Sequence, residues 1–179
     1  MLEHVLPGLF HAPNIHPLLV HFPLALWPTA LVFLALGYLR GSDELYRVGR
    51  WLLLAGTAGG VAAAITGWLA ADGLGHDHPG HDVIHDHRTL MLAALASALA
   101  GCAAALWTRP EARRKHRWAP VGITLVTCLF AALGADRGAL AVFGHGIGIK
   151  AERPAIAASD PGEAHGPPSQ GPSHDHHDH

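Results

Sequence analysis

Histidine is the residue type in this chain whose number and placement point most directly to chemistry. The 179 residues include 16 histidines, and neutral imidazole is a good ligand for zinc, copper, nickel and iron. Two arrangements occur: tracts in which histidine alternates with aspartate, and single histidines beside long apolar stretches. Both arrangements predict metal binding, but by different means.

The tracts lie in a central segment and at the end of the chain. Residues 75–87 read Gly-His-Asp-His-Pro-Gly-His-Asp-Val-Ile-His-Asp-His, and residues 174–179 read His-Asp-His-His-Asp-His. Neighbouring aspartates orient imidazoles and raise their basicity, so such tracts bind divalent ions almost regardless of fold. The alternative is a solvated, pH-responsive segment whose metal binding is incidental. The predicted secondary ligands are His76, His78, His81, His85, His174, His176, His177 and His179.

Four single histidines are predicted to form a framework metal site where helix ends meet: His16, His21, His87 and His145. His16 precedes Pro17, and proline is favoured as the first residue of a helix. His21 lies further into the same apolar stretch, His87 opens the third stretch, and His145 follows the fourth. An ionisable side chain at membrane depth is a functional candidate. Each could instead be a capping or interfacial residue bonded to backbone carbonyls.

Four apolar stretches must position these histidines, and they cover residues 17–39, 51–71, 89–107 and 118–135. A helix that rises about 1.5 Å per residue needs roughly 20 residues to cross a hydrocarbon core of roughly 30 Å. The stretches contain no Asp, Glu, Lys or Arg, whereas buried helices of soluble bundles usually carry a charged stripe. Each stretch is therefore predicted to be a transmembrane helix.

The rest of the chain flanks this membrane domain, which is predicted to cover residues 17–149. Residues 1–16 form an N-terminal segment. Residues 150–179 are rich in Pro, Gly, Ser and His and have no apolar periodicity, which predicts disorder. The predicted protein is therefore all-α, an up-down bundle of four transmembrane helices with a disordered His-rich C-terminal tail.

The basic residues predict the orientation of the bundle. Eight of the 12 Lys and Arg residues lie in segments 40–50 and 108–117, and the positive-inside rule assigns such loops to the cytoplasm. Both termini and the 72–88 loop would then face the periplasm or exterior of a bacterial inner membrane. So would every histidine except His116.

Several classes of function receive no support from the sequence. A net charge of −2 does not favour a nucleic-acid partner. Neither a nucleophile–base arrangement nor a phosphate-binding loop is evident, so we predict no catalytic residues and favour a protein that is not an enzyme. Cys102 and Cys128 lie within apolar stretches and are predicted to be packing residues.

Small residues and prolines predict how the helices meet. Gly56, Gly60 and Ala64 recur every four residues in the second stretch, a spacing that lets helix backbones approach closely. This face is also the predicted docking surface for a partner in a membrane complex. In the first stretch, Pro23 and Pro28 predict a kinked helix.

Two motifs carry a resemblance to a known family. Residues 14–26 read Asn-Ile-His-Pro-Leu-Leu-Val-His-Phe-Pro-Leu-Ala-Leu, and residues 141–149 read Ala-Val-Phe-Gly-His-Gly-Ile-Gly-Ile. Through them the chain resembles the DUF2231 family of bacterial four-helix membrane proteins over about residues 14–149. The resemblance implies the architecture and no particular activity. The matching positions are His16, Pro17, His21, Pro23, His145 and Gly146, with His87 at the third helix start.

Three functions are compatible with these features. The favoured one is binding of a transition metal ion (Zn, Cu, Ni or Fe) by histidines that face the periplasm. The second is a haem b-binding electron-transfer subunit, with His21 and His87 as the axial pair. The third is a structural or assembly subunit that docks through the small-residue face of the second helix.

Overall fold

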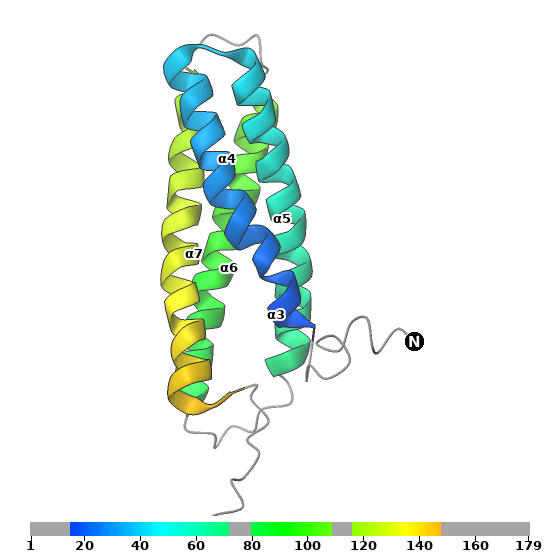
Figure 1. The fold of residues 1–179 in the computed structure, drawn as a ribbon, viewed down its shortest axis with the longest axis vertical. Helices are drawn as coiled ribbons and strands as arrows, with labels where there is room; N and C mark the ends of the chain where they lie inside the picture. Colours follow the sequence, from blue (N-terminus) through cyan, green and yellow to red (C-terminus); the bar gives the residue numbers. More distant parts are fainter. Residues whose placement is uncertain (1–14, 72–79, 109–115, 148–179) are drawn as a thin grey trace, which may run out of the picture. The chain divides into compact units, whose positions relative to one another are not determined.

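The computed structural model describes residues 15–71, 80–108 and 116–147, and helices account for nearly all of them (Figure 1). Four long helices are apolar enough to cross a membrane, and the first of them is divided near its start. This confirms the predicted all-α bundle of four transmembrane helices. The elements are α3 (His16–Leu19), α4 (His21–Arg40), α5 (Asp43–Ala71), α6 (His81–Trp107) and α7 (Trp118–His145).

The outer surface of the bundle is suited to lipid. In the most apolar 18-residue window of each long helix, only 22–28% of the window is buried inside the bundle. Large side chains on this surface include Ile65 and Leu129, which are each 58% exposed. Soluble monomers rarely expose continuous apolar surface on this scale, so these faces contact the hydrocarbon of the membrane.

The interior pairs large side chains with small ones. Trp27 and Leu34 of α4 and Leu53 of α5 are almost fully buried. The opposing positions of α6 carry residues that let the helices approach closely, and they are Ala94, Ala98, Gly101 and Ala105. Alternation of large and small residues across facing helices fills a core without voids.

The two cysteines are free thiols in this structure. Cys102 is buried, with its sulfur 3.3 Å from the Thr57 hydroxyl oxygen, and Cys128 is half-buried beside the core. Both therefore act as packing residues.

The small-residue face of α5 packs inside the chain. A Cβ atom added at Gly60 would lie 2.8 Å from Cζ2 of Trp27, and one at Gly56 would lie 2.9 Å from Cβ of Leu26. Ala64 is half-buried at the same face. The surface predicted to dock a membrane partner is thus largely covered by α4, because the bulky Trp27 side chain needs these glycines.

Three predicted helix ends are corrected. The second helix begins at Asp43 instead of residue 51, the third begins at His81 instead of residue 89, and the fourth ends at His145 instead of residue 135. The loss of apolar character marks where the hydrocarbon ends, but backbone hydrogen bonding continues through the polar residues beyond it. The helices stop where other signals occur, such as left-handed Gly146 after α7.

The first helix is interrupted at Val20, between α3 and α4. Pro23 has no N–H group, so the carbonyl of Leu19 lacks the usual helical donor four residues later. Pro28 lies inside α4 without a comparable break. The division of the helix therefore lies one turn before Pro23, and Pro28 is accommodated within α4.

Candidate functional site

A cavity of about 90 Å³ lies between the start of the first helix, the C-terminal half of α5 and the N-terminal half of α6. Its volume equals that of about three water molecules at roughly 30 Å³ each. Polar side chains come from His16, His87 and Arg88, and the remaining lining is mostly apolar, with Trp27, Trp68 and Met91 among the larger residues. The structure therefore brings together two of the four predicted framework histidines.

His16 is held by the end of α5. Its Nδ1 atom lies 2.9 Å from the carbonyl oxygen of Ala63, and the ring packs on Gly67, where an added Cβ would lie 2.8 Å from the ring's Cε1. The side chain therefore connects the first helix to the second, and only glycine at residue 67 leaves room for it.

His87 is held in the same way by α7. Its Nδ1 atom lies 2.7 Å from the carbonyl oxygen of Gly134, and an added Cβ at Gly138 would lie 3.1 Å from its Cε1. The ring is therefore fixed against the fourth helix, while the residue also lines the cavity that contains His16.

These contacts determine which ring nitrogen carries the lone pair. A carbonyl oxygen only accepts hydrogen bonds, so Nδ1 of each ring must carry the proton that is donated. The neutral ring then has its lone pair on Nε2. Metal-binding histidines commonly use this arrangement, in which one ring nitrogen donates to a carbonyl and the other binds the ion.

A sulfur atom lies beside the His87 contact. Met91 follows His87 by one helical turn and lines the cavity, and its Sδ would lie 2.6 Å from a Cβ added at Gly134. The cavity is closed on another side by Arg88, whose guanidinium carbon lies 4.5 Å from the centre of a Trp68 ring. His16, His87 and Met91 thus border the cavity, and the side chains of His87 and Met91 also contact α7 at Gly134.

The other two framework histidines lie elsewhere. His21 is exposed on α4, and its Nδ1 atom is 3.3 Å from the carbonyl oxygen of Leu18 in the preceding turn. His145 ends α7 and packs near Gly80, where an added Cβ would lie 3.1 Å from Cβ of His145. Neither residue lines the cavity, so the predicted convergence of four histidines is not seen.

Only part of the histidine tracts falls within the described residues. His81 and His85 are exposed, one turn apart, at the start of α6. Across residues 15–71, 80–108 and 116–147, no group of three or more His, Cys, Asp or Glu residues is arranged to hold a metal ion. The predicted disordered tail and residues 1–14 of the N-terminal segment lie outside these ranges. So do the other tract ligands, which are His76, His78, His174, His176, His177 and His179.

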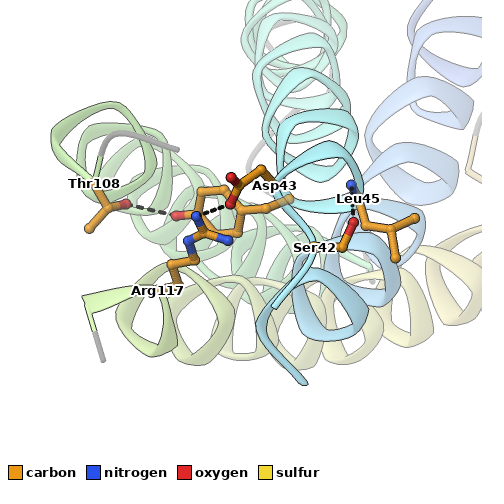
Figure 2. Close-up of polar contacts among 6 residues, drawn as sticks. Ser42, Asp43, Leu45, Thr108 and Arg117 are labelled. Atoms are coloured by element: carbon orange, nitrogen blue, oxygen red, sulfur yellow. Dashed lines mark hydrogen bonds and ion pairs between the residues drawn. The ribbon is translucent and has the colours of Figure 1, made fainter. Parts of the chain in front are cut away.

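A second polar cluster, which the sequence did not predict, lies at the other end of the bundle (Figure 2). The Tyr46 hydroxyl is 2.7 Å from the Thr108 hydroxyl, and Arg117 forms an ion pair with Asp43. The Arg117 guanidinium carbon also lies 4.9 Å from the centre of the Tyr46 ring. This cluster joins α5 to the ends of α6 and α7. Charged residues at the start of α5, such as Asp43, are the available signal, but their place outside the apolar stretches favours a loop.

Comparison with known proteins identifies the family. No curated protein and no solved structure matches the chain. The family model described as "Predicted membrane protein (DUF2231)" matches residues 12–151, a range that includes every described helix. The chain is therefore a membrane protein that belongs to the DUF2231 family.

Proposed function

We propose that this membrane protein binds one transition metal ion in the cavity lined by His16 and His87. The observation that supports the proposal most strongly is the pair of Nδ1-to-carbonyl hydrogen bonds, at 2.9 and 2.7 Å. They fix both rings and leave Nε2 as the basic nitrogen of each neutral imidazole. A fixed orientation of this kind raises the affinity of a histidine for metal.

Copper(I) fits the donor atoms best. Imidazole suits several transition metals, but thioether sulfur selects soft ions such as Cu(I), and Met91 lies one turn from His87 on the cavity wall. Cu(I) also carries a single positive charge, which costs less to bury in an apolar wall than the charge of a divalent ion. Arg88 at the rim disfavours a more highly charged ion further.

The histidine tracts would serve as the approach to this site. Residues 72–80 connect the C-terminal end of α5 to the start of α6, and both helices line the cavity through residues near those ends. With both termini and this loop in the periplasm of a bacterial inner membrane, the tracts would collect ions on the side where the cavity lies. A buffering or delivery role follows from this arrangement.

Haem b is a weaker candidate. Sites for ligands of drug size or larger occupy roughly 300–1,000 Å³, whereas this cavity measures about 90 Å³. Of the two axial ligands considered, His87 lines the cavity and His21 is exposed on α4. A porphyrin would require the helices to separate and His21 to turn inward.

The test is a Cu(I) competition titration of the full chain, purified in detergent without an affinity tag. We expect one tight equivalent beyond the weaker sites of the tracts, and its loss in His16→Ala and His87→Ala. Met91→Leu should weaken Cu(I) binding at least tenfold and affect Zn(II) much less. His21→Ala is the matched control and should retain the tight site. Retention of that site in both cavity variants would refute the proposal.

A further inference from the structure

The contacts of His16 and His87 are repeated at a constant spacing in the chain. His16 bonds to Ala63, and His87 bonds to Gly134; in both cases the carbonyl lies 47 residues later. The glycines under the two rings, Gly67 and Gly138, are again the same distance beyond their histidines. Each element of the first contact therefore recurs 71 residues later.

Burial follows the same spacing along both hairpins. Most buried positions of α4 and α6 correspond to each other, as do most of α5 and α7. The exceptions are Thr57, Cys102 and Ala141, whose counterparts are half-buried. The pairs differ widely in residue type, so the agreement comes from helix register and not from sequence identity. The buried pairs are 23/94, 27/98, 30/101, 34/105, 37/108, 46/117, 49/120, 53/124, 56/127, 60/131 and 63/134.

Packing between the helices supports the correspondence. α4 packs along α5 as α6 packs along α7, and the contacts of α4 with α7 match those of α5 with α6 in extent. Two corresponding residues, Tyr46 and Arg117, contact each other directly. Contact between equivalent residues is expected only next to a symmetry axis.

We infer that residues 16–71 and 87–142 are two copies of one helical-hairpin unit, related by a pseudo-two-fold axis along the bundle, and that each copy is closed by a histidine clasp. A clasp consists of a histidine at the start of the first helix, a carbonyl on the second helix and a glycine one turn later. Because α4 and α6 run in the same direction, the copies form a parallel repeat, a type known among membrane proteins.

The repeat also defines the ligand set. Position 16 corresponds to position 87, whereas His21 corresponds to Leu92 and His145 lies beyond the second copy. Only the clasp histidines are therefore equivalent in the two units, so we assign them as the paired ligands and exclude His21 and His145. This assignment rests on the proposed function, but the repeat and the clasps do not.

Glycine variants of the full chain test the clasps without any ligand. Gly67→Ala and Gly138→Ala should each lower the melting temperature in detergent by several degrees, because the new methyl group meets a ring. When the His→Ala change of the same unit is already present, the Gly→Ala change should lower the melting temperature little further, because the ring that the methyl group would meet is gone. His16→Ala and Gly138→Ala lie in different units, so their effects on the melting temperature should be additive. Gly122→Ala is the control, since an added Cβ there meets nothing within 4 Å.

Asparagine variants separate the clasp from metal binding. Asn retains an N–H donor for the carbonyl but has no basic ring nitrogen. His16→Asn and His87→Asn should therefore melt within a few degrees of the wild type, well above the corresponding Leu variants, while losing the tight Cu(I) equivalent. The clasps and the repeat are refuted if the Asn variants are as unstable as the Leu variants. They are also refuted if the effect of each glycine change on the melting temperature depends equally on both histidines. Stable Asn variants that still bind Cu(I) would refute only the metal site.

Discussion

Under the proposed function, the two cavity histidines combine roles that the sequence presented as alternatives. A histidine bonded to a backbone carbonyl was the structural explanation, and a metal ligand was the functional one. In His16 and His87, Nδ1 donates a hydrogen bond to a backbone carbonyl, so the lone pair of each neutral ring is on Nε2. Under the proposed function, the same bond that connects two helices also orients a metal ligand. The residue types were predictable, but their carbonyl partners, 47 residues away, were not.

At the far end of the bundle, the Tyr46 hydroxyl allows a test of how the hairpins are joined. Tyr46→Phe removes its 2.7 Å bond to Thr108 while the buried ring keeps its shape. Thr108 retains a second bond, to the carbonyl of Ala104. We expect a loss of about 0.5–1.5 kcal/mol, measured by reversible unfolding in mixed micelles. Thr29→Ala removes an exposed hydroxyl bonded to its own helix and should change stability by less than about 0.5 kcal/mol; equal losses in both variants would contradict this role of Tyr46.

Each transmembrane element was predictable in its middle and less so at its ends. Hydropathy detects the hydrocarbon crossing, and all four crossings occur as predicted. The helices extend beyond it because backbone hydrogen bonding continues until a turn ends it, as at left-handed Gly41 after α4 and Gly146 after α7. Ser42 before Asp43 and Glu44 is a typical helix start, and the Leu45 N–H lies 3.3 Å from its hydroxyl oxygen. Capping residues would therefore have located the start of α5 at Asp43 instead of residue 51.

The start of α5 can be tested directly. Ser42→Ala should destabilise the protein by about 0.5–2 kcal/mol, because an N–H in the first turn loses its acceptor. Ser42→Asp keeps an acceptor oxygen and should be nearly neutral. Thermal unfolding monitored by far-ultraviolet circular dichroism will show the difference. A neutral Ser42→Ala variant would mean that the cap does not stabilise this helix.

The packing of α4 on α5 depends on the absence of a side chain at Gly60. Gly60→Ala adds a methyl group 2.8 Å from Cζ2 of buried Trp27, and overpacking of this kind costs about 1–3 kcal/mol. We expect a corresponding loss of stability in the same unfolding assay. Gly122→Ala, at an open position of α7, should be tolerated. A tolerated Gly60→Ala would show that the two helices can separate readily, and the docking role predicted for this face would regain support.

For the whole molecule, the segregation of arginines predicts that both termini lie in the periplasm. A topology reporter that is active only after export, fused after His179, should be active in a bacterial host. The same reporter inserted near residue 112, in the arginine-rich segment, should be inactive. The opposite pattern would place the histidine cavity on the cytoplasmic side and remove the periplasmic source of metal from the proposal.

The repeat is the whole-molecule feature that the sequence concealed. Corresponding positions keep their burial but seldom their residue type, as in Trp27 and Ala98 or Leu53 and Thr124. Packing of a large residue from one unit against a small residue from the other requires such divergence. The four apolar stretches were visible in the sequence, but the relation between the hairpins emerges only from helix register in three dimensions.

The most direct test of the central claim is copper K-edge X-ray absorption spectroscopy of the full chain, loaded with one equivalent of Cu(I). We predict that imidazole nitrogens and one sulfur atom coordinate the copper ion. Sulfur should disappear in Met91→Leu, and the imidazole scattering should decrease in the His16→Asn His87→Asn double variant. A spectrum that contains only nitrogen or oxygen ligands and is unchanged by all three substitutions would contradict metal binding in this cavity.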